Sequence, residues 1–247
     1  MLPRVYELKD AVSDVAHPQA YFRNFEACLT SGHTVIIHYV RIERQLRELH
    51  DDAWLNLKHR AMPHLTAPVP GRGWQALFDT LNEAKGYAYL KRMGCEEIAF
   101  INKQENIKTP DLRATLNGAL ALCEVKTINI GDDEAQRRRR VAEGEIFVSH
   151  VSAVVEHGFL AKVTSTLTHG VSQLDCYDPD RKARRVIFVV LHFNDWVGDY
   201  QTEYIAQLDS HMLQNPVEGA EVVLNPASNL FNRHFTMKSA PVVLDWP

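Results

Sequence analysis

An Asn117-Gly118 dipeptide between two β-prone segments is the feature that most constrains how this chain folds. Asn-Gly strongly favours a two-residue type I′ hairpin turn, because both residues tolerate the positive φ angles that this turn requires. Such a turn sets Leu116 opposite Ala119 and fixes the register of every further pair. In that register Asp111 lies directly opposite Glu124.

Side chains alternate along a strand, so the hairpin has one apolar face and one polar face. The face expected in the core carries Leu112, Leu116, Ala119, Ala121, Cys123 and Val125. The other face carries Asp111, Arg113, Glu124 and Lys126. On it the carboxylates of Asp111 and Glu124 would lie about 5 Å apart at Cβ, and like charges at that distance repel each other.

A divalent cation would relieve the repulsion between Asp111 and Glu124. Mg²⁺ is bound by one or two carboxylates together with waters and phosphate oxygens, which matches this pair. Mn²⁺ fits the same oxygen ligands, whereas zinc is less suited because no cysteine or histidine lies beside the pair in a ligand pattern. The alternative is an exposed strand face on which Lys126 forms an ordinary salt bridge. The leucines at positions 120 and 122 argue against it, because they share the face with Glu124.

The remaining hydrophobic patterns predict an α/β fold around this hairpin. Helices are expected within Pro18–Leu65, over Trp74–Met93 with Gly94 as its cap, over Ile146–Leu174 with an interruption near Gly158, and over Tyr200–Leu213. Strands are expected over Glu97–Asn102, Pro110–Leu116, Ala119–Ile130 and Arg185–Phe193. The last of these is almost continuously apolar, as in a central strand that is buried on both faces. Residues 217–247 receive no assignment.

Two prolines and two glycines between Thr66 and Gly73 interrupt the helical pattern and mark the best candidate for a domain boundary. We therefore expect an N-terminal helical lobe over residues 1–70 and a second domain over residues 71–247.

A family resemblance rests on Pro110-Asp111, twelve intervening residues and Glu124-Val125-Lys126. This pattern resembles the PD-(D/E)XK signature of restriction-endonuclease-like and recombination nucleases, and it follows a helix and a strand in the order that family uses. The resemblance covers residues 74–193. It implies a restriction-endonuclease-like core, in which helices flank a mixed central β-sheet. It also implies a Mg²⁺-dependent deoxyribonuclease, of the endonuclease type, that hydrolyses DNA phosphodiester bonds.

The resemblance also implies roles for individual residues. Asp111 and Glu124 would bind the metal, with the backbone carbonyl of Val125 as a third ligand, and Lys126 would position or activate the attacking water. Glu83 stands where such families often place a further acid on the preceding helix, although it is equally suited to be a solvent-facing helix acid. Whether one or two metal ions bind is left open.

Candidate DNA contacts lie outside the signature. In the run Arg137–Arg140, we expect Arg137, Arg138 and Arg140 to supply contacts to the DNA backbone, while some of the run is simply solvated. A second basic cluster, at Arg181, Lys182, Arg184 and Arg185, is a weaker candidate. Gln173 and Tyr177 resemble the Q-x-x-x-Y element of RecB-like nucleases, and the alternative is an ordinary helix end before Asp178-Pro179.

Composition sets limits on location and partners. The net charge of −4 is a mild argument against nucleic-acid binding, so the distribution of basic residues matters more than their sum. The four cysteines are dispersed and form no C-x-x-C pair, no apolar stretch reaches membrane-spanning length, and the N-terminus does not resemble a signal peptide. These features predict a cytoplasmic protein that does not enter membranes. A homodimer would cut both DNA strands most simply. The rival function is a non-catalytic module that binds nucleic acid or protein on the same fold.

Overall fold

The structure, a computed structural model, describes most of the chain. The described residues are 2–12, 21–32, 35–66, 68, 73–102, 108–129, 136, 140, 143–145, 153–192 and 200–227. They divide into two compact units, one up to Ala84 and the other from Lys85 onward, so the division falls inside one helix. The linker that carries the predicted boundary, residues 67 and 69–72, lies outside the described residues.

The first unit is helical, as predicted for Pro18–Leu65. Its elements are α1 (Pro3–Asp10), α2 (Phe25–Ser31), α3 (Val35–Leu46), α4 (Asp51–Ala61), the 3-10 turn η1 (Met62–His64) and the first part of α5 (Gln75–Arg92). The sequence patterns did not reveal α1. The core of the first unit is aromatic: Phe22, Phe25 and Tyr39 are buried, and the Phe25 and Tyr39 ring centroids lie 4.8 Å apart.

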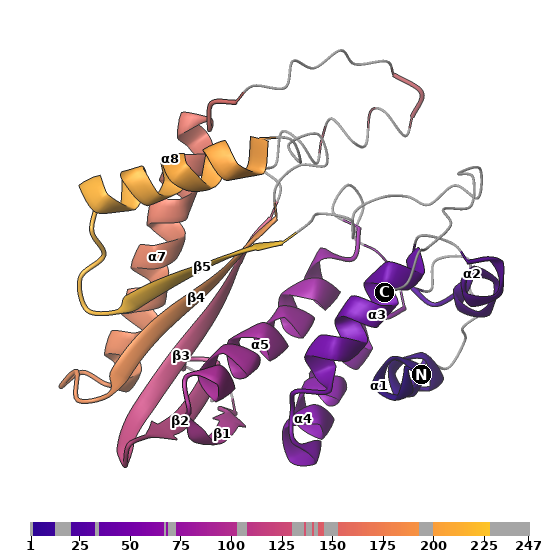
Figure 1. The fold of residues 1–247 in the computed structure, drawn as a ribbon, viewed down its shortest axis with the longest axis horizontal. Helices are drawn as coiled ribbons and strands as arrows, with labels where there is room; N and C mark the ends of the chain where they lie inside the picture. The colour runs from indigo at the N-terminus through magenta and orange to yellow at the C-terminus, as the bar shows by residue number, and fades with distance from the viewer. Residues whose placement is uncertain are drawn as a thin grey trace. The chain divides into compact units, whose positions relative to one another are not determined.

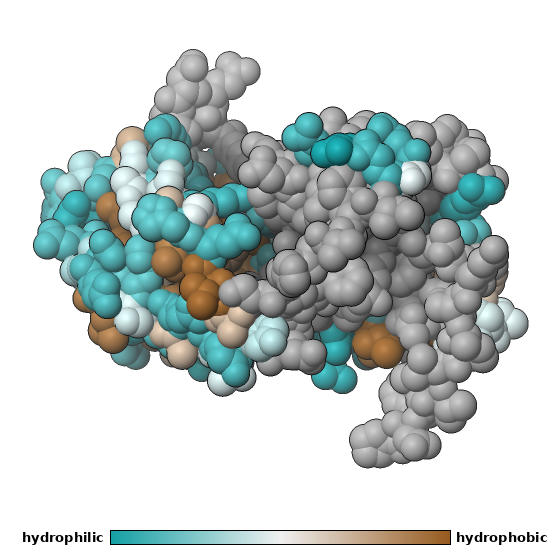
Figure 2. Space-filling view, turned by 90° about the horizontal axis from the view of Figure 1, so that it is seen from above, coloured by the Kyte–Doolittle hydropathy of each residue, from teal (hydrophilic) through white to brown (hydrophobic). Residues whose placement is uncertain are grey.

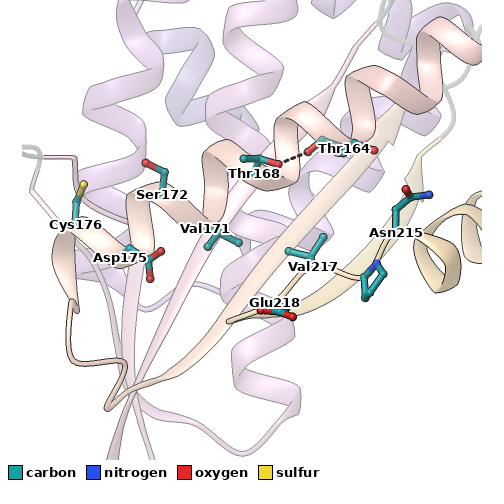
Figure 3. A pocket seen from close by; sticks show the side chains of 10 residues that line it. Thr164, Thr168, Val171, Ser172, Asp175, Cys176, Asn215, Val217 and Glu218 are labelled. Atoms are coloured by element: carbon teal, nitrogen blue, oxygen red, sulfur yellow. Dashed lines mark hydrogen bonds between the residues drawn. The ribbon is translucent and has the colours of Figure 1, made fainter.

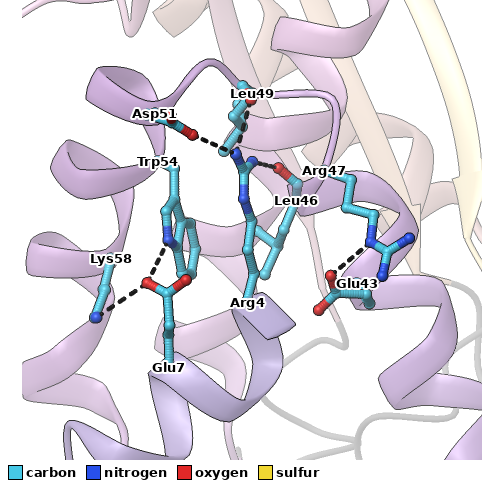
Figure 4. A network of polar contacts seen from close by, with 9 residues as sticks. All are labelled: Arg4, Glu7, Glu43, Leu46, Arg47, Leu49, Asp51, Trp54 and Lys58. Carbon is cyan, nitrogen blue, oxygen red and sulfur yellow. Dashed lines mark hydrogen bonds and ion pairs between the residues drawn. The ribbon is translucent and has the colours of Figure 1, made fainter. Parts of the chain in front are cut away.

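The end of α3 shows how a charged side chain holds this unit together (Figure 4). The guanidinium of Arg4 donates hydrogen bonds to the carbonyl oxygens of Leu46 and, at 3.0 Å, of Leu49, and it pairs with Asp51 at 3.3 Å. The last carbonyls of a helix lack partners within the helix. Arg4 therefore satisfies the C-terminal end of α3 and ties α1 to it.

The second unit is built on a five-stranded mixed sheet in the order β1-β2-β3-β4-β5. Its strands are β1 (Glu96–Phe100), β2 (Leu112–Leu116), β3 (Ala119–Ile128), β4 (Arg184–His192) and β5 (Glu221–Ala227). The pairs β1–β2 and β2–β3 are antiparallel, whereas β3–β4 and β4–β5 are parallel. The predicted mixed α/β class is thus confirmed, and β4 is buried on both faces as expected.

The turn between β2 and β3 forms as predicted. Asn117 and Gly118 have φ angles of 51° and 79°, the positive values of a type I′ turn. Leu116 pairs with Ala119, and the register continues without a break to Leu112 opposite Cys123.

Helices cover both faces of the sheet. Helices α7 (His157–Tyr177) and α8 (Gln201–Gln214) lie together on one face (Figure 1). There Leu167 and Leu208 belong to one core cluster with Ile187 of β4. On the other face, the C-terminal part of α5 packs against the sheet through Gly86, where an added Cβ would lie 2.5 Å from Val125 Cγ2.

Two segments differ from the sequence-based expectation. The helix predicted over Ile146–Leu174 begins only at His157, since residues 153–156 are not helical and 146–152 lie outside the described residues. The interruption predicted near Gly158 therefore marks the first turn of α7. Strand β5 falls in the stretch left unassigned, because an edge strand is recognised chiefly by its pairing with β4.

On the face seen in Figure 2, the described residues are mainly hydrophilic, with hydrophobic patches between polar residues. Within the described ranges, the exposed large hydrophobic residues are Leu55, Met62, Leu120, Val154, Tyr177 and Leu213. Among the described helices, not one is both long and apolar enough to span a bilayer.

Replacing Gly86 by alanine tests the close approach of α5 to the strand that carries the candidate site. The new Cβ would clash with the stiff, β-branched Val125, at a cost of about 1–3 kcal/mol. We expect this cost to exceed the gain of about 1 kcal/mol in helix propensity, so that Gly86→Ala lowers the free energy of unfolding. Urea denaturation measures this change.

The matched control is Gly158→Ala in the first turn of α7, where an added Cβ has no heavy atom within 4 Å. Alanine is the better helix former by about 1 kcal/mol, so this variant should be at least as stable as the wild type. Equal stability of the two variants would show that α5 does not pack closely on β3.

Candidate active site

The hairpin pairing follows the predicted register as far as Leu112 opposite Cys123, and Asp111 and Glu124 are the next residue on each strand. Asp111 stands one residue before β2, and its carbonyl oxygen accepts a hydrogen bond from the N–H of Ile101 at 2.9 Å, which extends the β1–β2 pairing. Its side-chain Oδ2 accepts the N–H of Val125 at 2.8 Å. The carboxylate of Asp111 is therefore held against the residue that follows Glu124.

Glu124 carries its charge inside the protein. Only 2% of the residue is exposed, and its Oε1 lies 2.6 Å from Nζ of Lys126. Burying a carboxylate is costly unless a cation or hydrogen-bond donors compensate it. The alternative prediction of an exposed strand face is wrong for Glu124, because its side chain is buried. The salt bridge of Lys126 that belonged to this alternative is present, with Glu124 as its partner.

Of the leucines predicted to share this face, Leu122 is fully buried beneath α7, whereas Leu120 is 47% exposed. The buried Leu122 therefore separates Glu124 from the exposed start of β3, and the carboxylate of Glu124 lies in the packed part of the sheet.

Gln173 of α7 reaches the same place. Its Oε1 accepts a hydrogen bond from Nζ of Lys126, and its Nε2 donates to the carbonyl oxygen of Thr109 at 3.4 Å. The side chain of Gln173 thus links α7 to β3 and to the segment before Asp111. Tyr177, one turn further along the helix, is 37% exposed.

The thiol of Cys123, the residue before Glu124, is influenced by the charges of Asp111 and Glu124. Cys123 points to the opposite face of β3 and is fully buried. Burial raises the pKa of the Cys123 thiol well above its usual value, and the negative charges of Asp111 and Glu124 raise that pKa further. Both carboxylates therefore lie close enough to Cys123 to affect the pKa of its thiol.

The donor set at this point consists of hard oxygen atoms. The described residues contain no group of three or more His, Cys, Asp and Glu side chains arranged to hold a metal ion. Asp111 and Glu124 offer two carboxylates, and Mg²⁺ commonly takes only one or two from a protein, with waters and substrate oxygens as its other ligands. The two acids fit Mg²⁺ or Mn²⁺ in chemistry and in charge.

Glu83 lies in the first unit, in the middle of α5. It is 7% exposed and its Oε2 lies 2.6 Å from Nη1 of Arg60. The alternative of a solvent-facing helix acid is wrong, since the carboxylate is buried and paired. Its predicted place among the metal ligands stays a prediction.

The predicted DNA-binding arginines are described only in part. Arg140 pairs with Glu145, at 2.6 Å from Nη2, and this partner raises the pKa of the guanidinium. Arg137 and Arg138 lie outside the described residues. The role of all three in DNA binding stays a prediction.

The second basic cluster is neutralised by neighbouring acids, and Arg185 is buried at 5% exposure. The ion pairs are Arg181–Asp175, Lys182–Asp180, Arg184–Glu221 and Arg185–Asp175. Arg181 and Arg185 thus connect to Asp175 of α7, Arg184 connects β4 to Glu221 of β5, and Lys182 pairs within its own loop, while a role of the cluster in DNA binding stays a prediction.

Three further polar residues near the ends of the parallel strands were not found from the sequence. Lys162 of α7 donates to the carbonyl oxygen of Asn129 at 2.9 Å. On the other face, burial lowers the pKa of Lys85 to about 8. Burial, reinforced by the charge of Lys85, lowers the pKa of His192 to about 3. None has a local sequence signal, because packing between distant segments creates these environments.

A hollow of about 670 Å³ lies between α7 and the loop before β5 (Figure 3). Its lining residues are Thr164, Thr168, Val171, Ser172, Asp175, Cys176, Asn215, Pro216, Val217 and Glu218. None of the described residues predicted for the active site lines it.

Comparison with known proteins adds no relative: no family model, curated protein or solved structure matches the chain.

The burial of His192 makes stability depend on pH. The folded state takes up this proton only near pH 3, whereas an exposed histidine takes it up near pH 6.5, so the unfolded state binds more protons between these values. The contribution of His192 to stability is therefore present above about pH 6.5 and is lost as the pH falls toward 3. We expect His192→Gln to unfold with a flatter pH dependence over this window, measured by urea denaturation from pH 7.5 to 4.5. Identical slopes would contradict the buried, neutral state of His192.

Proposed function

We propose that this protein is a Mg²⁺-dependent nuclease of the PD-(D/E)XK kind that hydrolyses DNA phosphodiester bonds. The observation that carries the proposal is the buried Glu124, paired with Lys126 and set beside Asp111 by the hairpin register. Two acids and a lysine at this spacing form the signature of that family, and the mixed sheet with helices on both faces agrees with a restriction-endonuclease-like core.

Each residue has a role that its position supports. Asp111 and Glu124 would hold the metal, with the carbonyl of Val125 as a further ligand. When bound, Mg²⁺ lowers the pKa of a water and polarises the phosphoryl oxygen. Lys126, 2.6 Å from Glu124, would position the attacking water and stabilise the charge that develops on the phosphate.

Gln173 is a positioning residue in this proposal. It contacts Lys126 and the carbonyl oxygen of Thr109, so it holds the ammonium group of Lys126 near the segment that carries Asp111. Catalysis is sensitive to such positioning, because a displacement of about 1 Å can cost a hundredfold in rate.

Further parts of the proposal extend from the site to the whole protein. We propose an endonuclease in the cytoplasm, and a homodimer when both strands of a duplex are cut, since one subunit offers one pair of acids. Glu83 and the arginines at 137, 138 and 140 are proposed as an additional acid and as contacts to the DNA backbone.

Purified protein should cleave DNA when Mg²⁺ or Mn²⁺ is supplied, and removal of the metal by EDTA should abolish cleavage. We expect Lys126→Ala to lower the rate constant by about 100- to 10,000-fold, the usual contribution of a positioned acid or base. Glu124→Gln removes a metal ligand and should lower the rate constant at least as far. Release of a fluorescent fragment from a labelled oligonucleotide, followed under single-turnover conditions, measures the rate.

The matched control is Glu221→Gln, which removes a partly exposed, ion-paired carboxylate from β5 in the same sheet. Its cleavage rate should equal that of the wild type. Unchanged cleavage by Glu124→Gln would exclude this site, and tight DNA binding without any cleavage would favour the rival, a non-catalytic binding module.

A further inference from the structure

The face of the sheet that carries Asp111 and Glu124 is covered unevenly. Helix α7 packs over β3 and β4, and beneath it Leu122 and Ile187 are fully buried. On the neighbouring part of this face, Arg113 of β2 and Leu120 of β3 are exposed, with Leu120 at 47%. An open strip therefore adjoins the candidate active site.

This strip is hollowed. A pocket of about 330 Å³ is lined by Glu97, Arg113, Ala114, Thr115 and Leu120. Thr115 pairs with Leu120 across the hairpin, and its hydroxyl donates to Oε2 of Glu97 at 3.0 Å, so these side chains lie on one face. The pocket combines the cation of Arg113, the carboxylate of Glu97, which is engaged by the Thr115 hydroxyl, and the apolar surface of Leu120.

Arg113 is the distinctive member of this lining. It stands two residues after Asp111, so by strand alternation its side chain lies on the same face, about 7 Å further along the strand. That step is comparable with the spacing of neighbouring phosphates in a nucleic acid strand. Among the described residues, the side chain of Arg113 forms no ion pair or hydrogen bond, in contrast to the arginines at 181, 184 and 185.

We propose that this pocket holds one unpaired nucleoside of the DNA strand, next to the scissile phosphate at Asp111 and Glu124. Arg113 contacts the phosphate of that nucleoside, since guanidinium groups bind phosphate oxygens through two parallel hydrogen bonds. Leu120 packs against the base, and Thr115 lies at its polar edge. The inference rests on the proposed nuclease function and adds a substrate class to it.

The class of DNA substrate follows from the geometry of the pocket. A base that lies in a hollow on the face of a sheet is removed from its stack and cannot remain paired, and extruding it from a perfect duplex costs a few kcal/mol. Single-stranded DNA and duplexes with an unpaired base avoid that cost. The protein therefore prefers strands that are unpaired beside the cleavage point.

Binding in EDTA tests this inference separately from catalysis, because no turnover is needed. The probes are a fluorescent single-stranded oligonucleotide, the same sequence as a perfect duplex, and a duplex with one bulged 2-aminopurine. We expect the single strand and the bulged duplex to bind at least about tenfold more tightly than the perfect duplex, which corresponds to 1.4 kcal/mol. The 2-aminopurine emission should rise on binding as the base leaves its stack.

Arg113→Ala should weaken binding of the single strand by about tenfold or more, the value of a charge-assisted hydrogen bond, and should abolish the rise in emission. The matched control is Arg92→Ala, which removes an exposed arginine at the end of α5 and the same formal charge. It should leave both signals nearly unchanged.

Two results would overturn the inference: equal effects of Arg113→Ala and Arg92→Ala, or equal affinity of the wild type for the single strand and the perfect duplex. Leu120→Asn separates the base contact from the phosphate contact, and it should reduce the preference for unpaired DNA while duplex binding is kept. If selective binding depends on Arg113 but no DNA is cleaved with Mg²⁺, the pocket is upheld and the proposed catalysis fails.

Discussion

The register of the β2–β3 hairpin is the constraint on which the site depends. Asn117 and Gly118 adopt positive φ angles that few other residue pairs tolerate, and this turn sets which side chains lie opposite one another. A slip of one residue would turn every side chain of β3 to the other face. Glu124 would then point toward α5, and Asp111 would lose its neighbour.

Packing around the hairpin buries and fixes the polar side chains that this register brings together. Leu122 and α7 exclude water from one side of Glu124, so its charge interacts strongly with Lys126. The hydrogen bond of Asp111 to the N–H of Val125 fixes the second acid, and Gln173 limits the motion of the ammonium group. The close approach of α5 at Gly86 supports the strand from behind. The reactive groups are therefore held by rigid elements, as preorganised catalysis requires.

Local signals predicted the elements that carry their own pattern. The Asn-Gly turn, the apolar stripe of α5 and the apolar run of β4 were predicted from a few neighbouring residues, and they form as expected. The start of α7, the edge strand β5 and helix α1 were not predicted, because distant partners stabilise them. The sequence also suggested that Arg185 lies on a basic surface, whereas Asp175 of α7 holds it inside the protein. The contact of Gln173 with Lys126 was only weakly signalled by the Q-x-x-x-Y spacing.

The central claim is that Asp111 and Glu124 together form a site for a hard divalent cation. A crystal of the protein soaked in Mn²⁺ tests it most directly, through anomalous scattering recorded near the manganese absorption edge. A single strong peak bound by one carboxylate oxygen of each acid, and by the carbonyl of Val125, is the predicted result. A peak at other residues only, with Glu124 still paired to Lys126 and away from any ion, would contradict the claim.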